Sequence, residues 1–443
     1  MAAPMRTLLN KLKLSTDFSR NVLTIMTGTG IAQIIAVVAA PILSRLYSPA
    51  DMGIFNLYYS IILVITVIVS GRYEQTIVLP KDDKDAVNLT ALSFMITLVV
   101  GLVLLIPVMV FPESTVTILK NKNISPWLIW IPFSAILVGV SQTLNNYFIR
   151  RKDFRHTSKS PMMQSLTKAT VNIGMGLKNI QGGMIWGYLF GQIVSVIVLL
   201  TGRTKLLLRD FSKYFEWSHC LAMAKKYKNY ALTLIPANLI GSLAGNMPVF
   251  LLTAFFGDSI VGLYFMCTHL INLPMTVIGK SLSDVSYKHT MDIIHSNKSL
   301  TEYVERVTAH LSLIAIIPFF VLMFFSQIIF SFVLGAEYQT SGLYTQILLP
   351  AFLLRFLSSP ITLFSQTNKP HLLLYWQIMF LLLTIASLLV GGMVFRSDIT
   401  TMALLSASNT FCYFVLLMLN FKISGAKFRN VCTNMKNLVL KIK

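Results

Sequence analysis

Residues 87–111 read VNLTALSFMITLVVGLVLLIPVMVF, an apolar run without a charged residue. As a helix, such a run is long enough to cross the ~30 Å hydrocarbon core of a bilayer. Runs of this kind recur along the whole 443-residue chain, in which 55% of the residues are hydrophobic and 12% are charged. Soluble domains average about 25% charged residues, and the mean hydropathy here is +0.68. The sequence therefore predicts an all-α membrane protein with many spans.

Twelve apolar segments are predicted to be transmembrane helices. They cover residues 22–44, 53–79, 87–111, 125–149, 161–178, 182–202, 231–255, 261–284, 308–335, 342–366, 371–395 and 399–421. The fifth is the least apolar of them, because Lys168 and Asn172 interrupt it. The first is longer than the roughly 7–15 apolar residues of a signal peptide, so we expect it to remain as a helix.

The positive charge of the chain falls mainly on one side of these segments. The chain has 37 Lys and Arg against 17 Asp and Glu, a net charge of +20. With a cytoplasmic N-terminus, most of the basic residues lie on the inner side. Cytoplasmic loops of membrane proteins are enriched in Lys and Arg. The pattern therefore predicts that both termini are cytoplasmic, and it accounts for the charge without a nucleic-acid partner.

Two halves of six spans each are predicted. The expected parts are an N-terminal six-helix bundle (1–202), a cytoplasmic linker (203–230), a C-terminal six-helix bundle (231–422) and a basic cytoplasmic tail (423–443). The linker mixes aromatic and basic residues, which is typical of an interfacial helix.

The halves also share a weak repeat. PILSRLYSPADMGIF (41–55) and PVFLLTAFFGDSIVGLY (248–264) each have a proline in the first helix of a half, followed by Asp, Gly and an aromatic residue. Six spans is an even number, so the halves would run in the same direction and be related by an axis along the membrane normal. This architecture suits a transporter with a cavity between two bundles.

A charged pair interrupts the end of the second segment. Residues 66–83 read TVIVSGRYEQTIVLPKDD, in which Arg72 and Glu74 separate two apolar patches. Residues two apart do not share a helical face, so these side chains need separate partners or a break in the helix after Gly71. Two interpretations stay open: a positively charged anchor at the membrane surface, or a functional gate. Lys280 follows Gly279 at the inner end of the eighth segment as Arg72 follows Gly71.

Several stretches resemble a known family. RLYSPADMGIF (45–55), GRYEQTIVLPKDDKDA (71–86), NNYFIRRKDFR (145–155) and GGMIWGYLFGQIVSVIVLL (182–200) are similar to the polysaccharide transporter family, the Wzx-type flippases of the MOP superfamily. The resemblance covers most of the first half. In the second half it depends on little beyond the span count and the repeat.

The resemblance implies a MATE-like fold of two six-helix bundles. It also implies that undecaprenyl-pyrophosphate-linked sugars, such as an O-antigen unit of lipopolysaccharide, are flipped outward across the bacterial inner membrane. Arg72, Glu74, Arg150 and Lys280 are then candidate substrate-binding residues. Membrane lipids surround such a protein, and its candidate partners are a polysaccharide polymerase and a chain-length regulator.

Two cations fall well inside predicted spans. Lys168 lies in PMMQSLTKATVNIG, and Arg355 lies near the middle of the tenth segment, in LLPAFLLRFLSSPITLF. A Lys or Arg at the centre of a spanning helix costs about 2.5–3.5 kcal/mol on insertion scales, so it usually faces a cavity or a partner. We expect both to bind the pyrophosphate of the substrate. The competing interpretation is that they snorkel to the membrane surface or that the predicted span boundaries are misplaced.

Amide side chains form two stripes on predicted helices. One stripe comprises Gln142, Asn145 and Asn146, and the other comprises Asn238, Ser242 and Asn246. Such stripes suit sugar hydroxyls and helix–helix hydrogen bonds equally well. Asn145 and Asn246 are therefore candidate glycan-binding residues. A further stripe of small residues, Gly183, Gly187 and Gly191, predicts close helix packing.

Other functions are weighed against the flippase. A cation-coupled multidrug exporter of the same fold would typically need a buried carboxylate, whereas the carboxylates here lie at span ends. A membrane enzyme such as a polymerase would need a large outer loop, and no HExxH, GxSxG or P-loop motif is present. A scaffold protein would not need cations inside the membrane. We expect no enzymatic activity, metal or organic cofactor, and coupling to H⁺ or Na⁺ stays open.

Overall fold

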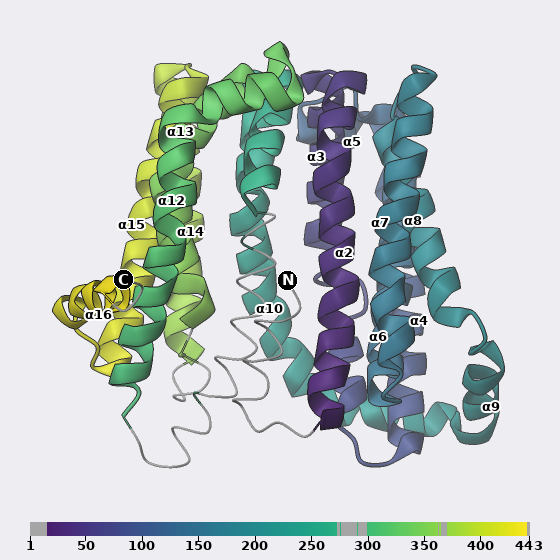
Figure 1. Ribbon diagram of the computed structural model, residues 1–443. Helices are drawn as coiled ribbons and strands as arrows, with labels where there is room; N and C mark the ends of the chain where they lie inside the picture. The colour runs from purple at the N-terminus through teal and green to yellow at the C-terminus, as the bar shows by residue number, and fades with distance from the viewer. Residues whose placement is uncertain are drawn as a thin grey trace. The chain divides into compact units, whose positions relative to one another are not determined.

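The chain folds into long helices in the computed structural model (Figure 1). The structure describes residues 16–272, 275, 290, 299–361, 363–364 and 370–440, and no strand occurs among them. The long helices of the first half are α2 (Thr16–Leu46), α3 (Pro49–Ile65), α4 (Asp83–Val110), α6 (Trp130–Arg150), α7 (Phe154–Leu177) and α8 (Gly183–Leu200). Those of the second half are α10 (Trp217–Phe256), a helix over residues 258–272, α12 (Thr301–Leu334), α13 (Gln339–Ser358), α14 (Pro370–Leu389) and α15 (Asp398–Ser424).

Shorter elements connect these helices. They are α5 (Pro112–Leu119), α9 (Thr204–Tyr214), α16 (Phe428–Leu440), the 3₁₀ turns η1 (Tyr73–Val78), η2 (Ser125–Trp127), η3 (Ala336–Tyr338) and η4 (Ser359–Ile361), and the π-helical turn η5 (Val390–Phe395). The two ends of α15 show how particular residues determine where a helix begins and ends. Ser397 accepts a hydrogen bond from the Thr400 N–H at the start, and Gly425 takes φ 75° at the end, a conformation that favours glycine.

Each of the twelve predicted segments coincides with a helix in the described part of the chain. The all-α membrane fold is therefore confirmed, and seven of the described helices are long and apolar enough to cross a membrane. Several boundaries differ from the prediction, and two of them differ most. The second segment is helical only to Ile65, not to residue 79, and the seventh helix begins at Trp217 instead of residue 231. The eighth segment extends beyond the described residues.

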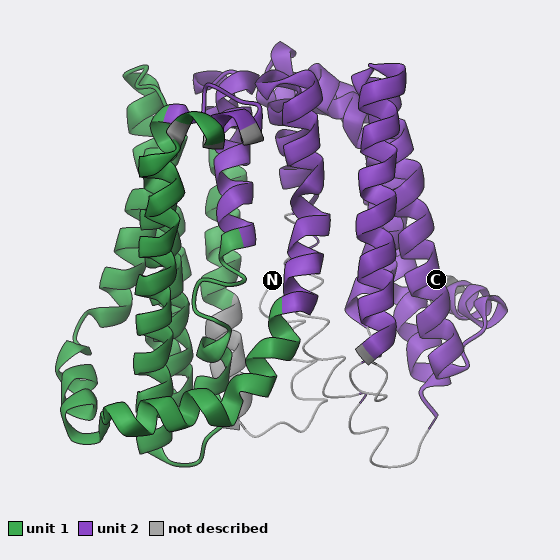
Figure 2. Cartoon of the chain, turned by 180° about the vertical axis from the view of Figure 1, so that it is seen from behind, with its two compact units in different colours: residues 1–39, 65–115, 126–235 green, residues 40–64, 116–125, 236–443 purple. Residues whose placement is uncertain are grey.

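Two compact units form within the chain (Figure 2). Unit 1 comprises residues 1–39, 65–115 and 126–235, and unit 2 comprises residues 40–64, 116–125 and 236–443. In unit 1, a core around Leu89 and Phe148 joins α4 and α6 to α9 and the start of α10. In unit 2, a core around Val304 and Leu417 joins α12 and α15 to α16. The predicted bundle limits, 1–202 and 231–422, stay a prediction.

The repeat predicted from the sequence appears in unit 2 as a reciprocal helix contact. A Cβ atom added at Gly53 of α3 would lie 1.9 Å from the carbonyl oxygen of Asp258, and one added at Gly262 would lie 1.7 Å from that of Pro49. The two glycines occupy equivalent places in the repeat. Gly53 lies four residues after Pro49, and Gly262 lies four residues after Asp258. Backbones can approach this closely only where side chains are absent, so the repeat is a feature of the packing.

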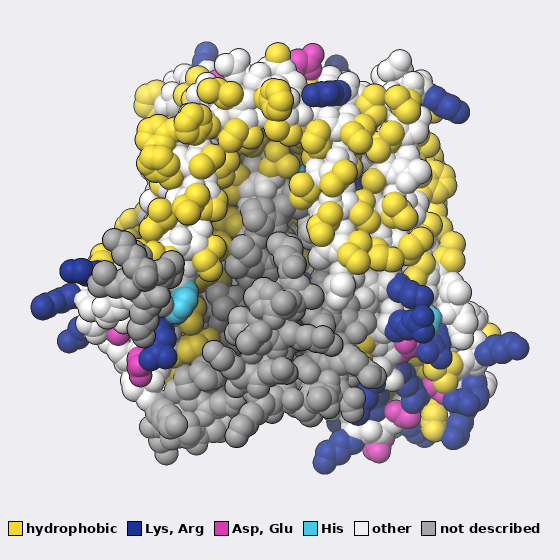
Figure 3. All heavy atoms as spheres, in the orientation of Figure 1, with side chains coloured by type: hydrophobic (Ala, Val, Ile, Leu, Met, Phe, Trp, Pro, Cys, Tyr) yellow, Lys and Arg dark blue, Asp and Glu magenta, His cyan; other side chains and the backbone are white. Residues whose placement is uncertain are grey.

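The outward faces of the helices are apolar. Phe332 is 82% exposed on α12, and Val110 is 60% exposed on α4. Figure 3 shows hydrophobic side chains covering the helices, while Lys and Arg gather around α9 and α16. Surfaces of this kind are typical of contact with lipid, because soluble proteins rarely expose such large apolar areas.

Candidate functional site

The second apolar segment breaks before the charged pair. After Ile65 the chain makes tight turns, with Ile68 N–H donating to Ile65 O at 2.9 Å and Gly71 N–H donating to Ile68 O at 3.0 Å. Gly71 and Arg72 then both take a left-handed φ, of 62° and 61°. Such a φ is uncommon for a residue with a side chain. Of the two alternatives, separate partners or a break after Gly71, the structure has a break, and it begins earlier, after Ile65.

This break brings Arg72 and Glu74 together. Arg72 Nη1 lies 3.7 Å from Glu74 Oε1, and the side chains are 14% and 3% exposed. Ser70 Oγ donates a hydrogen bond of 2.6 Å to Glu74 Oε2. Glu74 is therefore held by a hydroxyl and faces a cation at a distance longer than a hydrogen bond.

The Arg72 guanidinium donates no hydrogen bond within the part of the chain that the structure describes. Its Nε is buried without a partner, and no described residue accepts a hydrogen bond from the side chain. A guanidinium has five N–H donors. Arg72 is therefore a largely buried cation whose donors bond to no described residue.

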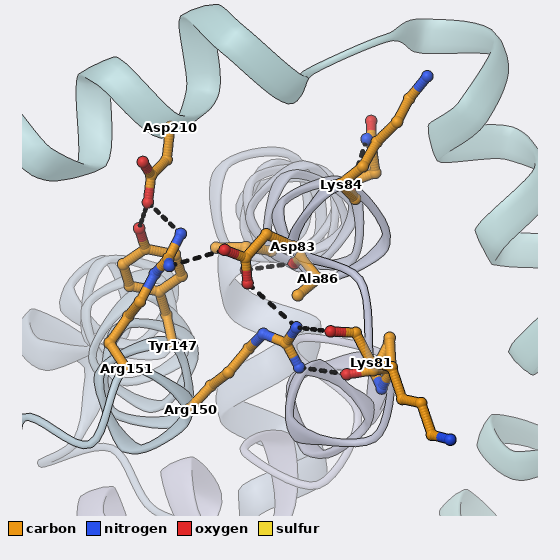
Figure 4. Close-up of polar contacts among 11 residues, drawn as sticks. Lys81, Asp83, Lys84, Ala86, Tyr147, Arg150, Arg151 and Asp210 are labelled. Carbon is orange, nitrogen blue, oxygen red and sulfur yellow. Dashed lines mark hydrogen bonds and ion pairs between the residues drawn. The ribbon is translucent and has the colours of Figure 1, made fainter.

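Arg150 and Arg151, at the end of α6, are both bonded through their terminal Nη donors (Figure 4). Arg150 Nη1 donates to Pro80 O, and its Nη2 donates to Lys81 O at 3.0 Å and to Asp83 at 3.2 Å. Arg151 Nη1 donates to the same carboxylate, at 2.8 Å from Asp83 Oδ2. Asp83 lies between the two arginines in Figure 4, and it ties the start of α4 to the end of α6.

Arg151 also fastens α9 to this cluster. Its Nη2 pairs with Asp210, and Tyr147 Oη donates 2.6 Å to the same Asp210 oxygen. Asp210 is 3% exposed, so its charge depends on these two partners and on Arg209, whose Nε lies 3.7 Å from Asp210 Oδ1. Burial of a carboxylate is costly unless it is paired and hydrogen-bonded. The cluster therefore positions the linker helix on unit 1.

A second set of contacts fastens the start of α10. Asp85 accepts from His219 Nε2 at 2.7 Å and pairs with Lys226 at 3.0 Å, and Lys84 pairs with Glu216 at 2.8 Å. The Lys84 ammonium lowers the pKa of the exposed Glu216.

Asp153, in the turn between α6 and α7, forms a smaller charged group. It pairs with His156 at 3.0 Å and with Arg203 at 2.6 Å. Burial by itself would raise the pKa of Asp153, but the hydrogen bonds and charges of His156 and Arg203 outweigh burial and lower it. Asp153 is therefore a carboxylate that stays ionised because of its neighbours.

The two cations inside predicted spans have different surroundings. Lys168 is half-buried on α7, and its Nζ lies 6.0 Å from the ring centre of Tyr188 on α8. Arg355 lies in the last turn of α13, not near the middle of a span, because the helix ends at Ser358. There it donates to Asn272 Oδ1 at 3.2 Å, and no carboxylate of the described residues pairs with it. A helix C-terminus favours a cation, so the position of Arg355 in the last turn of α13 partly stabilises its charge.

The amide stripes divide into bonded and free side chains. Asn246 Nδ2 donates to Ser242 O at 2.8 Å, and Asn146 Nδ2 donates to Gln142 O at 3.0 Å. Asn145 makes no hydrogen bond in the part of the chain that the structure describes, and it is half-buried. Asn145 is therefore the better placed of the two predicted glycan-binding amides.

The glycine stripe of α8 packs against α7, as predicted. A Cβ atom at Gly187 would lie 1.7 Å from Asn172 Oδ1, and one at Gly191 would lie 3.1 Å from Gln164 O. Lys168 lies on the same face of α7, between these two contacts. The position of Lys168 is thus fixed by close helix packing.

The structure brings together Arg72 with Glu74, and Arg150 with residues that sequence reasoning left out. Lys280 lies outside the described residues. The missed residues are Asp83, Tyr147, Arg151 and Asp210. Asp83 stands in one of the stretches that resemble the family, but the partners of this cluster are far apart in the sequence. Local patterns could not have paired them.

Comparisons with known proteins agree with this fold. A family model described as "Polysaccharide biosynthesis protein" matches residues 42–342. A search of the curated proteins gives no match.

Among solved structures, the lipid II flippase MurJ in an inward closed conformation is similar, with a TM-score of 0.73, 12% identity, and coverage of 94% of this chain and 91% of that one. An inward-facing MATE-family multidrug resistance transporter has a TM-score of 0.55 at 11% identity, with 93% and 95% covered. A MOP-superfamily transporter from Pyrococcus furiosus also has a TM-score of 0.55, at 12% identity, with 91% and 95% covered.

These structures show the fold, which is the one predicted, and the family model covers well over half of the chain. The chain belongs to the polysaccharide biosynthesis protein family, as the resemblance of its first half predicted.

Proposed function

We propose that this protein flips an undecaprenyl-pyrophosphate-linked oligosaccharide from the cytoplasmic to the periplasmic leaflet of the bacterial inner membrane by alternating access. Family membership and the fold support transport of a lipid-linked sugar in the MOP superfamily. An O-antigen repeat unit or a related surface polysaccharide unit is the proposed cargo. We place both termini in the cytoplasm, with six-helix bundles at residues 1–202 and 231–422.

The proposal depends on one observation, the unused donors of Arg72. A pyrophosphate presents several acceptor oxygens, and a guanidinium binds such groups through paired N–H donors. Arg72 is 14% exposed and meets Glu74 only at 3.7 Å. A largely buried cation in this state gains more from an anionic ligand than an exposed one does, because the surroundings screen it less.

Glu74 then holds the site when no substrate is bound. Its carboxylate partly compensates the Arg72 charge, and Ser70 fixes its orientation at 2.6 Å. An arriving pyrophosphate carries more negative charge and more acceptors than one carboxylate. It would replace the long Arg72–Glu74 contact with direct hydrogen bonds.

The test replaces Arg72 in a strain that lacks its own flippase. We expect Arg72→Ala to abolish surface polysaccharide, and Arg72→Lys to restore only part of it, because an ammonium lacks the paired donors. Surface polysaccharide and the amount of protein in the membrane are both measured. Arg306→Ala is the matched control, since this exposed arginine already pairs with Glu302 on its own helix. Normal surface polysaccharide in Arg72→Ala would contradict the proposal.

The remaining predicted residues have secondary roles in this proposal. Lys168 and Arg355 supply positive potential along the path of the headgroup, and Asn145 binds a sugar hydroxyl. Arg150 positions the loop that follows η1, since its donors are bonded to Pro80, Lys81 and Asp83. Asn246, which is bonded to its own helix, contributes less. A polysaccharide polymerase and a chain-length regulator are the proposed partners.

A cation-coupled exporter is the second candidate function, and Glu74 favours it. This carboxylate is 2% exposed. In the sequence it stands at the end of a predicted span, and in the structure it is a buried acid. Glu74→Gln separates the two functions. In a flippase we expect the variant to keep its polysaccharide substrate, because Arg72 keeps its charge. In an exporter whose coupling ion binds Glu74, transport would be lost.

A further inference from the structure

Helix α10 is too long to be a membrane span alone. Its 40 residues, Trp217–Phe256, would extend about 60 Å at 1.5 Å per residue, roughly twice the ~30 Å hydrocarbon core. Its first part, residues 217–235, belongs to unit 1. That part therefore extends the helix beyond the hydrocarbon core, so its surface lies in a different environment from that of the membrane span.

One face of this first part is docked on unit 1. Cys220 is 1% exposed and Met223 is 6% exposed, and both lie in the core of unit 1. Lys226 on the flank pairs with Asp85 at 3.0 Å. These contacts fix which side of the helix faces outward.

The outward face is a stripe of large apolar side chains with two lysines among them. We name it the linker stripe, and its residues are Trp217, Leu221, Lys225, Lys228 and Leu232. They recur every three or four positions and so share one helical face. Trp217 is 58% exposed, Leu221 54% and Leu232 66%.

The charged residues around the stripe differ in their pairing according to whether they face the protein or face outward. Those that face the protein are paired: Lys84 with Glu216, Arg151 with Asp210, and Lys226 with Asp85. Lys225 and Lys228 are exposed, and neither pairs with a carboxylate of the described residues. Glu216, Asp210 and Asp85 are thus already paired, and the linker stripe itself has two lysines and no acid.

We propose that the linker stripe binds the anionic headgroups of phospholipids. Exposed aromatic and aliphatic side chains interleaved with lysines suit the boundary between headgroups and acyl chains. Anionic lipids attract such basic segments. An acidic protein or a nucleic acid would satisfy the lysines but leave three large apolar side chains in water. Because the same helix continues into a membrane span, the Leu232 end of the stripe lies next to the membrane surface. This inference does not depend on the transported substrate.

The first experiment measures lipid selectivity of the full-length protein in vesicles that contain spin-labelled phosphatidylglycerol or spin-labelled phosphatidylcholine. We expect the wild-type protein to restrict the anionic lipid preferentially, with less preference at high salt. Lys225→Gln/Lys228→Gln should lower the preference at least about threefold. Both sites are exposed, so folding is retained. Lys120→Gln/Lys122→Gln, which neutralises two exposed lysines in the connection after α5, is the matched control and should keep it.

The second experiment locates the stripe directly. Cys432 is exposed, and the other three cysteines are buried, so Leu221→Cys in a Cys432→Ser background accepts one nitroxide label. In phosphatidylglycerol vesicles we expect the label to collide more with oxygen than with a water-soluble nickel chelate. A label that collides mainly with the chelate would overturn the proposal. So would an unchanged lipid preference in Lys225→Gln/Lys228→Gln, or binding of nucleic acid without any lipid preference.

Discussion

Two arginine sites of unit 1 lie at the ends of helices and differ in what their donors do. Arg151 pairs with both Asp83 and Asp210, and its neighbour Arg150 is bonded to two carbonyls and Asp83. Arg72 meets one carboxylate at 3.7 Å. A cation whose terminal Nη donors are bonded to carboxylates of the protein stabilises the fold, whereas one whose Nη donors bond to no described residue can serve a ligand. Arginine content by itself therefore does not identify a binding site.

The largest expected effect on folding comes from Arg151→Ala. The change leaves Asp210, which is 3% exposed, as a buried carboxylate with only the Tyr147 hydroxyl as a close partner. Breaking a buried ion pair on one side costs about 3–5 kcal/mol. We expect a clear fall in the free energy of unfolding in detergent, and a smaller fall for Arg72→Ala, because the Arg72–Glu74 contact is long at 3.7 Å and Ser70 still donates to Glu74.

Similar losses in Arg151→Ala and Arg72→Ala would break the comparison between the two sites. Asp210→Asn in the Arg151→Ala background sharpens it, since neutralising the carboxylate should return part of the lost stability.

A smaller effect is expected from Arg150→Lys. Lysine keeps the charge but cannot reach two carbonyls and a carboxylate with a planar fork. We expect a loss of about 1–2 kcal/mol, measured by thermal unfolding, and faster proteolysis of the loop at residues 79–82. A lysine variant as stable as wild type would show that the contacts to Pro80 and Lys81 contribute little.

The smallest effect is a dependence on pH at Asp153. Its pKa is lowered in the folded protein by His156 and Arg203. A group of this kind adds stability above its unfolded pKa of about 3.9, and this stability is lost as the pH falls through the lower folded value. We expect Asp153→Asn to reduce the acid sensitivity of unfolding. An unchanged pH profile in this variant would show that the pairing at Asp153 adds no stability.

Local patterns predicted much of the fold. The twelve segments could be predicted because span length and hydropathy are properties of neighbouring residues, and the Gly183–Gly191 stripe could be predicted because its spacing is helical. The left-handed backbone at Arg72 could not be located from propensity, since a non-glycine residue rarely adopts it. The pairing of Arg151 with Asp210 joins the end of α6 to α9, and nothing in either stretch indicates the other.

By itself, the sequence determined that this protein is built from membrane-spanning helices with basic connections, because burial of backbone polar groups in lipid leaves few alternatives to the helix. Its stretches of family resemblance also pointed to the right family. Only the tertiary structure decided which cations are bonded to the protein and which are available. That outcome depends on distances between side chains from different helices, and these distances exist only once the helices have packed.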